Sequence, residues 1–363
     1  MRSRLARLCT NAAMSAFNPC KPIHWILDWD GTLTKGDTLD ALVRIARKAK
    51  PESNVDEAWN RIVAAYLADY DATLKQLAPE GCLPSDVHEE RKLLSDMAKV
   101  EQRSINRVSA SGIFEGLTWD IVECGAKEAL RSGEVQLRAG AEAFLRHVGA
   151  REDPHTRVLD EVDVLSVNWS ACFIMYCLSA GLTEGRKSFL FPFPNEKGVR
   201  RRAPFGTMRS RNAQHLRTSQ RGSLAEGRGL LMSIYSNELQ GISRDEVSTG
   251  ELCDGDSPIV ISSPDKLGQL HDMRRLHPCS LKPMQVAYVG DSRTDFECLL
   301  AADLGVCIRD DPMTSSQRAL KDSLGRLRIR CPHIQDHVDC DEWGVVWVRD
   351  FVELKDWMEA NTT

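Results

Sequence analysis

The sequence predicts an α/β protein built on a doubly wound parallel sheet, with an inserted helical block. Short apolar, β-branched runs alternate with helical stretches in the second half of the chain, which is typical of parallel sheets. A long block with helical periodicity separates the first apolar run from the others. Several of the runs stop at a carboxylate or a hydroxyl. Ligands of such sheets bind at the carboxyl ends of the strands, so these polar residues are the first candidates for a site.

The first strand is predicted over 23–30, "IHWILDWD", where apolar residues lead into two aspartates before Gly31. Short apolar runs predict further strands at 162–168, 233–239, 257–263, 285–291, 304–309 and 344–348. Apolar residues at three- and four-residue spacing predict helices at 37–49, 55–77, 88–108 and 118–133. Asp37 is the expected cap of the first of these helices. Between the later strands, helices are expected at 171–182, 263–273 and 295–304.

This pattern divides the chain into a core, a helical block and two atypical segments. The core is predicted over 23–36 and 149–363, and the helical block over 37–148. Residues 1–22 are expected to be a disordered leader or a presequence, because the first acidic residue is Asp28 and three arginines precede it. A cytoplasmic location is expected, with a mitochondrial one as the alternative that an arginine-rich start leaves open.

Residues 183–229 form a basic segment that fits neither a helix nor a strand. The segment holds nine Arg and two Lys against three Glu, and it is rich in Gly, Ser and Pro. Such a composition predicts a disordered insertion within the core, one that the fold does not need. A basic arm for an acidic partner is the functional alternative, and an artefact of the gene model is another.

Overall composition limits the class of partner. The chain is 42% hydrophobic with a net charge of -5, which does not suggest a nucleic-acid or membrane-surface role. It has no run of 18 apolar residues, so no membrane span is expected. Twelve cysteines occur without a C-x-x-C pair, which indicates reduced thiols packed as small apolar groups. The oligomeric state is not predicted.

Two carboxylates at the end of a buried strand need a partner. Asp28 and Asp30 lie two positions apart, so in an extended chain both side chains point the same way. Burying a charge is costly unless it is paired or bound to a metal. The first strand therefore predicts a cation beside its carboxyl end.

The other strand ends supply groups that match this expectation. Ser166 ends the strand at 162–168, Asp291 ends the strand at 285–291, and Asp295 follows four positions later. Lys266 opens a predicted helix. Carboxylates that converge on one rim are ligands for Mg²⁺, which usually brings a phosphate to complete its shell. A lysine and a hydroxyl beside the metal suit a phosphoryl group, and an aspartate can act as a covalent nucleophile.

Taken in order, "DWDGTLT", "VLSVNWS", "SPDKLGQL" and "VGDSRTDFECLLAADLGV" resemble the four motifs of the haloacid dehalogenase (HAD) superfamily. "IYSNEL", "STGEL" and "SSPDK" are similar to the phosphoserine-phosphatase-like branch, and especially to the phosphatase half of plant thiamine-monophosphate phosphatases. The resemblance covers about residues 23–310, except for 183–229 and much of the helical block.

The resemblance implies a role for each matching residue. Asp28 would be the nucleophile, and Asp30 the general acid that later acts as base. Ser166 and the backbone amide of Val167 would bind the phosphate. Lys266 would neutralise the charge on Asp28 and on the phosphoryl oxygens.

The resemblance also implies a metal site and a lid. Asp291 would bind Mg²⁺ together with the Asp28 carboxylate and the Asp30 carbonyl. Asp295 would support the metal shell or orient Lys266. The helical block over 37–148 would form an inserted helical cap over the site, as in this branch.

One departure from the pattern falls at the second motif. The branch usually has two glycines after the motif serine, and here Val167 and Asn168 take their place. The backbone amide is still available. Asn168 and Trp169 are therefore expected to shape the substrate pocket, which weakens phosphoserine as the expected substrate.

Several functions remain open from the sequence. The first hypothesis is a Mg²⁺-dependent phosphatase that acts on a small phosphomonoester through an aspartyl-phosphate. The expected partner is then a small phosphorylated metabolite. A phosphomutase would share Asp28 and Asp30 and differ in its cap. A catalytically inactive binding or scaffold protein is disfavoured because every catalytic position is filled. Dehalogenase chemistry does not need Asp30 or the metal aspartate.

Overall fold

A computed structural model of the chain describes residues 17–152, 158–182, 232–252, 259–275, 284–336 and 344–362. The predicted insertion over 183–229 lies outside the described residues, as do the first sixteen residues of the predicted leader. The strands in chain order are β1 (Ile23–Leu27), β2 (Glu161–Leu165), β3 (Met232–Tyr235), β4 (Gln285–Gly290), β5 (Leu304–Ile308) and β6 (Val345–Val348).

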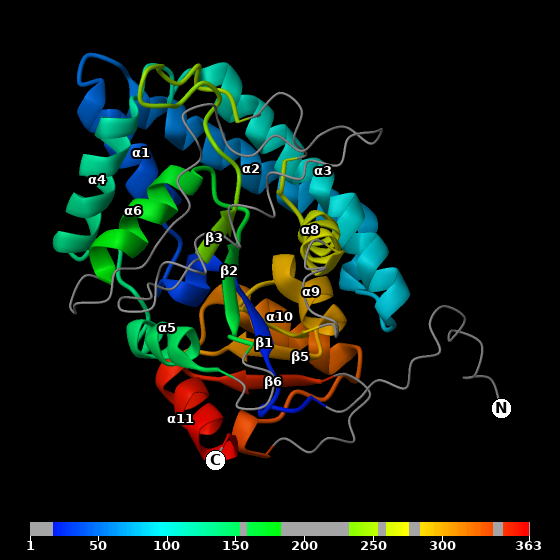
Figure 1. Cartoon of the computed structure of the whole chain (residues 1–363). Coiled ribbons are helices and arrows are strands. Elements are labelled where there is room, and N and C mark those ends of the chain that lie inside the picture. The colour runs from blue at the N-terminus through cyan, green and yellow to red at the C-terminus, as the bar shows by residue number, and fades with distance from the viewer. Residues whose placement is uncertain are drawn as a thin grey trace, which may run out of the picture.

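The six strands form one sheet in the order β3-β2-β1-β4-β5-β6, and every neighbouring pair is parallel. The predicted doubly wound parallel sheet is therefore confirmed. β1 occupies an inner place between β2 and β4, and Figure 1 shows it beside β2. Its carboxyl end is thus flanked by the ends of two strands that come much later in the chain.

Ten helices surround the sheet in the described part of the chain. They are α1 (Leu39–Ala49), α2 (Val55–Leu77), α3 (Val87–Ser111), α4 (Trp119–Arg131), α5 (Ala141–Ala150), α6 (Ala171–Gly181), α8 (Ser263–Arg275), α9 (Phe296–Ala301), α10 (Ser315–Arg326) and α11 (Phe351–Asn361).

Apolar side chains cover both faces of the sheet. On β1, Trp25 and Leu27 join a cluster with residues of α5, α6 and α11, while Ile26 joins a second cluster with residues of α8, α9 and α10. Alternate side chains of a strand point to opposite faces, so a strand covered on both sides reads as a continuous apolar run. This is why four of the five residues of 23–27 are apolar, and the fifth, His24, is paired with Asp163.

Helices α1–α4, here called the α1–α4 block, lie together on one side of the sheet, with α2 against α3 (Figure 1). Helix α5, which the sequence places in the cap, packs instead against β2 and α11. The boundaries of core and cap stay a prediction.

Residues 17–22, grouped by sequence with the leader, lie against the rest of the molecule. Phe17 is buried and stacks on Trp357 with ring centroids 6.4 Å apart. The guanidinium of Arg151 donates to the Lys21 carbonyl at 2.9 Å.

The predicted strand at 257–263 is wrong over its described residues. Residues 259–262 pair with no strand, and Ser263 already begins α8. The Val260 backbone instead exchanges two hydrogen bonds, each 2.8 Å long, with the side chain of Asn237. A side-chain amide thus replaces a neighbouring strand. The N-cap position of α1 is held by Thr38, one residue after the expected cap Asp37, whose carboxylate accepts from the Leu39 amide at 2.8 Å.

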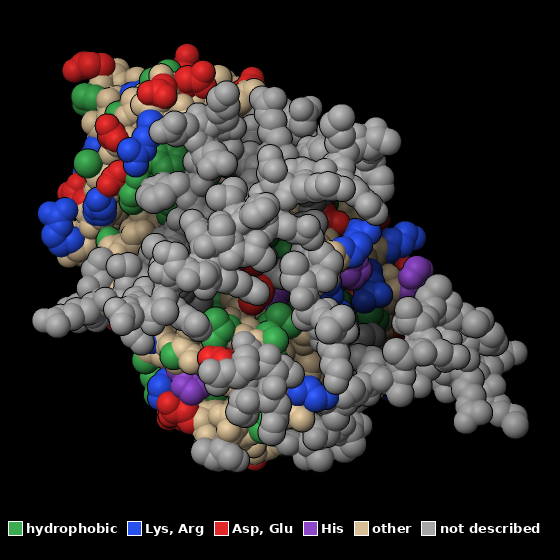
Figure 2. All heavy atoms as spheres, in the orientation of Figure 1, with side chains coloured by type: hydrophobic (Ala, Val, Ile, Leu, Met, Phe, Trp, Pro, Cys, Tyr) green, Lys and Arg blue, Asp and Glu red, His purple; other side chains and the backbone are tan. Residues whose placement is uncertain are grey.

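The surface carries charges of both signs. Figure 2 shows acidic side chains over the upper left of this face, on the α1–α4 block, and Lys, Arg and His side chains on the right, near α3 and α8. Among the described helices, none is both long and apolar enough to cross a membrane.

Candidate active site

The site begins where β1 ends. Asp28 directly follows the strand and is 3% exposed, and its amide donates to the Val289 carbonyl of β4 at 2.9 Å. The chain then turns sharply, with Gly31 at φ 71°. A Cβ atom on Gly31 would lie 2.4 Å from Asp291 Oδ2. Only glycine allows both this backbone conformation and this approach, so Gly31 brings the turn of the first motif against the carboxylate of the fourth.

Lys266 links two of the predicted carboxylates. Its side chain is fully buried, and its Nζ atom donates to Asp28 Oδ1 and to Asp295 Oδ1, both at 2.7 Å. Burial lowers the pKa of the amine, but the two carboxylates outweigh it and hold the pKa above its ordinary value. Lys266 is therefore a fixed positive charge beside the expected nucleophile.

Asp295 has its donors arranged around both oxygens. Besides Lys266, the Tyr288 hydroxyl donates to Oδ1 at 2.7 Å. Oδ2 accepts from the amides of Asp291 and Ser292 and from the Ser292 hydroxyl. A carboxylate with five donors is well compensated without a metal. Of the two roles expected for Asp295, the orientation of Lys266 is the one that this geometry supports.

Asp28, Asp291 and Asp295 form a cluster that suits a cation. One carboxylate oxygen of each lies within 4.8 Å of the others. Asp291 has little compensation of its own: the donor that the structure places on its carboxylate is the Ser316 hydroxyl, at 3.4 Å. Burial and the neighbouring carboxylates raise the pKa of Asp291 well above its ordinary value. Oxygen ligands with unbalanced negative charge fit a hard divalent cation such as Mg²⁺.

The carboxyl group of Asp28 is also shifted. Burial raises its pKa to about 7, against the attraction of Lys266, and Asp295 adds to the increase. A divalent cation beside the group would favour its ionised form. The metal-free site therefore holds more negative charge than its surroundings stabilise.

Asp30 is not part of the Asp28–Asp291–Asp295 cluster and has its own set of donors. Oδ1 accepts from the amide and the hydroxyl of Thr38, at 2.8 and 2.7 Å, and Oδ2 accepts from Asn168 Nδ2 at 2.8 Å. Burial and the charge of Asp37 raise the pKa of Asp30 to about 6, and the bonds from Asn168 and Thr38 oppose the rise. A carboxyl group that titrates near neutrality can act both as acid and as base.

The second motif ends β2 next to this group. In the register of β1 and β2, Leu27 lies opposite Val164, so Ser166 is just beyond the level of Asp28. Ser166 is fully buried, and its Oγ atom accepts from the Asn168 amide at 3.1 Å. Val167 packs at the edge of the second apolar cluster. Asn168 thus contacts the expected acid directly, a role that goes beyond the expected shaping of the pocket.

The sequence analysis did not identify Arg138, whose side chain hydrogen-bonds to the turn of the first motif. Its buried guanidinium donates to the carbonyls of Gly31 and Thr32, at 2.6 and 2.9 Å, and forms an ion pair with Asp310. Thr38 and Tyr288 were missed as well. None of these residues carries a motif, and only the folded structure brings them to the site.

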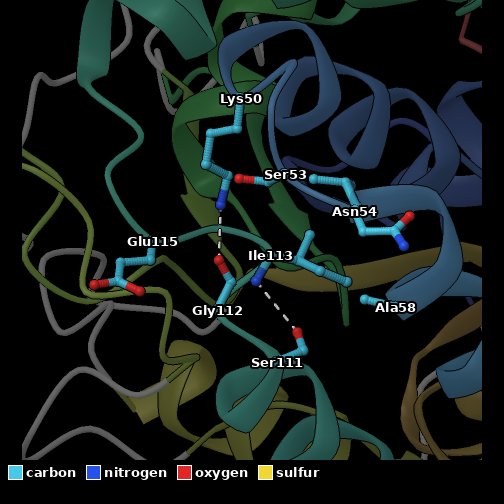
Figure 3. A pocket seen from close by; sticks show the side chains of 9 residues that line it. Lys50, Ser53, Asn54, Ala58, Ser111, Gly112, Ile113 and Glu115 are labelled. Carbon is cyan, nitrogen blue, oxygen red and sulfur yellow. Dashed lines mark hydrogen bonds between the residues drawn. The ribbon is translucent and has the colours of Figure 1, made fainter.

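Two cavities adjoin the α1–α4 block. The larger, about 340 Å³, is lined by residues that include Lys50, Ser111 and Glu115, and Figure 3 shows Lys50 reaching toward the Gly112 carbonyl. Lys50 follows the last residue of α1, and Thr38 precedes the first, so about 16 Å of helix separates this cavity from Asp30. A smaller cavity of about 260 Å³ borders Asp37 and Thr38. The smaller cavity is therefore the one that lies close to the candidate catalytic residues.

Comparison with known proteins gives remote relatives. No family model matches the chain. A CTO1 family protein of Schizosaccharomyces pombe is 24% identical over 291 residues, which cover 79% of this chain and 82% of that protein.

Solved structures similar to this chain include HAD-family hydrolases. A phosphoserine phosphatase, solved as an analogue of its phospho-aspartyl intermediate, is 18% identical with a TM-score of 0.39, covering 84% of this chain and 90% of the other. A phosphoserine phosphohydrolase-like protein from Francisella tularensis is 14% identical with a TM-score of 0.38, covering 92% and 98%. A HAD family hydrolase from Salmonella enterica serovar Typhi is 15% identical with a TM-score of 0.37, covering 80% and 65%.

Proposed function

We propose that the protein is a Mg²⁺-dependent phosphatase of the HAD type, which hydrolyses a small phosphomonoester through an aspartyl-phosphate. The observation that carries the proposal is the buried position of Lys266, 2.7 Å from both Asp28 and Asp295, with Asp291 in the same cluster. The four motifs in "DWDGTLT", "VLSVNWS", "SPDKLGQL" and "VGDSRTD" support it. The resemblance to plant thiamine-monophosphate phosphatases remains an expectation about the branch.

In the first step, an Asp28 carboxylate oxygen attacks phosphorus and the bond from phosphorus to the ester oxygen breaks. Asp30 gives its proton to that oxygen, so the alcohol leaves neutral. The phosphoryl group is then bonded to Asp28. Lys266 is placed to stabilise the negative charge, which is the main requirement of phosphoryl transfer.

In the second step, water attacks phosphorus. Asp30, now ionised, takes a proton from the water, and the bond from phosphorus to Asp28 breaks. Orthophosphate leaves, Asp28 is again a carboxylate and Asp30 is again protonated. A pKa of about 6 for Asp30 suits a group that must hold the proton in one step and lack it in the next.

The residues present fit a magnesium ion. Asp28 and Asp291 would hold it, together with the Asp30 carbonyl that the family resemblance implies. When bound, the ion supplies positive charge to the phosphoryl oxygens. Ser166 and the Val167 amide are the proposed phosphate contacts at the end of β2.

The test uses purified protein, p-nitrophenyl phosphate and a panel of biological phosphomonoesters, with phosphate release as readout. Release should require Mg²⁺ and stop in excess EDTA. Ca²⁺ should inhibit, because it takes more ligands in a looser geometry. A folded protein that releases no phosphate from any panel member would contradict the proposal, and full activity in EDTA would contradict its metal requirement.

A further inference from the structure

A buried carboxylate joins the α1–α4 block to the core. Glu90 lies in the first turn of α3 and is fully buried. One of its oxygens accepts from Arg293 Nη2 at 3.1 Å and from the Ser323 hydroxyl at 3.0 Å, and the other accepts from Arg326 Nη2 at 2.9 Å. Three donor side chains, from two separate parts of the core, therefore hydrogen-bond to one side chain of α3.

The start of α3 is docked on the core by apolar contacts as well. Leu94 belongs to the same buried cluster as Leu270 and Met273 of α8. Glu89, the residue beside Glu90, is exposed. The contrast between buried Glu90 and exposed Glu89 shows that the helix presents one face to the core, and that Glu90 lies on this face. A buried charge is tolerated when it is paired and hydrogen-bonded, and removing one partner of such a pair is costly.

Arg293 gives this contact its connection to the candidate site. It lies midway between Asp291 and Asp295, in the short turn that these residues delimit. Asp295 closes the turn through Ser292, whose side chain and backbone both take part in the cap. No described residue hydrogen-bonds Arg293 Nε, although that atom is buried, so the pair with Glu90 is a main restraint on this guanidinium.

We infer that Glu90 is a positioning residue for the proposed metal site. By holding Arg293, it keeps the turn that carries Asp291 and Asp295 in place against Asp28, so the docked position of α3 and the binding of Mg²⁺ favour each other. The inference rests on the metal site of the proposed function. It adds a residue of the helical block, 201 positions before Asp291 in the chain, to the groups that determine metal affinity.

The effects of Mg²⁺ binding and of α3 docking on each other are reciprocal, so the inference can be tested from either side. If a docked α3 raises the affinity for Mg²⁺, then Mg²⁺ must stabilise the docked α3 by the same factor. Arg326 provides the contrast. It holds the same carboxylate, but it is the last residue of α10 and is not part of the turn that carries Asp291 and Asp295. A purely structural role for Glu90 would involve both arginines equally.

The first experiment measures the Mg²⁺ concentration at half-maximal phosphate release in Glu90→Gln, Arg293→Gln and Arg326→Gln, with Glu89→Gln as the matched surface control. Glu90→Gln and Arg293→Gln should each raise this concentration about tenfold, and their combination should raise it no further, because both break one interaction. Arg326→Gln should lower the melting temperature with a smaller effect on Mg²⁺, and Glu89→Gln should change neither. Equal Mg²⁺ effects of the two arginine variants, or additive effects of Glu90 and Arg293, would overturn the inference.

The second experiment needs no substitution and no substrate. Amide hydrogen exchange of the wild-type protein is followed with and without Mg²⁺. The ion should slow exchange in the turn around 291–295 and also in the first turns of α3. Protection of the turn with no change in α3 would overturn the coupling, even if the variants do not fold. Protection of both segments in a protein that hydrolyses no phosphomonoester would keep the coupling and reject the proposed phosphatase activity.

Discussion

Replacing the expected nucleophile should inactivate the protein and yet stabilise its metal-free form. Asp28→Asn keeps the shape of the side chain and removes one of three clustered carboxylates, of which two pair with Lys266. Burial raises the pKa of Asp28 from 3.8 to about 7. Each unit corresponds to about 1.4 kcal/mol, so ionised Asp28 costs the metal-free fold at most about 4 kcal/mol above pH 7. Relaxation of the site reduces such costs, and we expect Asp28→Asn to recover about 2 kcal/mol.

The sign of the pH effect follows from the raised pKa. The folded protein holds a proton on Asp28 that the unfolded chain has lost between pH 3.8 and about 7. The stability from this group is therefore complete below pH 3.8 and is lost as the pH rises through about 7. The variant lacks this dependence. Its advantage over the wild type should be largest at pH 8, fall by about half at pH 5.5, and vanish below pH 3.8.

Thermal unfolding in EDTA measures this difference. A gain of about 2 kcal/mol should raise the melting temperature by roughly 4 °C at pH 8. Asp163→Asn is the control, because this buried carboxylate accepts from His24 and from the Ser233 amide, at 3.0 and 2.8 Å, and its loss should lower the melting temperature. A lower melting temperature for Asp28→Asn at pH 8, or an advantage that does not change with pH, would refute the reasoning.

Three other substitutions test the site. Asp30→Asn should reduce turnover of an alkyl phosphate more than that of p-nitrophenyl phosphate, whose leaving group needs no proton; equal losses in steady-state assays would argue against an acid role. Lys266→Met should lower kcat at least about 100-fold, because charge stabilisation in a buried site is a large term, and an unchanged kcat would remove Lys266 from the mechanism. Arg138→Met removes the donors to the Gly31 and Thr32 carbonyls. Because the Asp310 side chain is 31% exposed and keeps a hydrogen bond from Gln317, the substitution should lower the free energy of unfolding by about 1–3 kcal/mol in denaturant titrations, and a change below about 0.5 kcal/mol would contradict this.

The core of the site could be predicted because its groups follow strands. Apolar runs that end in polar residues mark the carboxyl ends of a parallel sheet, and that rule brought Asp28, Asp291 and Ser166 to one edge. The predicted runs at 23–30, 162–168 and 233–239 all extend past the ends of β1, β2 and β3. The residues beyond the strand ends form the turns that carry the site. Many of their side chains are still buried, although their backbone no longer pairs with a neighbouring strand.

The supporting residues could not be predicted, because their partners are distant in the chain. Arg138 contacts the Gly31 carbonyl 107 positions away, and Glu90 contacts Arg293 203 positions away. The local periodicity of a sequence contains no information about such long-range pairs. The error at 257–263 has a related cause: an apolar, β-branched run predicts a strand, but the side chain of Asn237 supplies the hydrogen bonds that a neighbouring strand would have given.

The inner place of β1 has a consequence for how the protein is made. The strand leaves the ribosome first, but its neighbours β2 and β4 begin only at Glu161 and Gln285. A nascent chain that has not reached Gln285 cannot pair β1 on one side, and it lacks both aspartates of the fourth motif. During most of synthesis, the sheet around the hydrophobic strand β1 is incomplete. The strand then exposes hydrophobic surface of the kind that chaperones bind. Chains arrested before β4 should therefore be retained by chaperones, whereas chains that extend beyond α10 should be released.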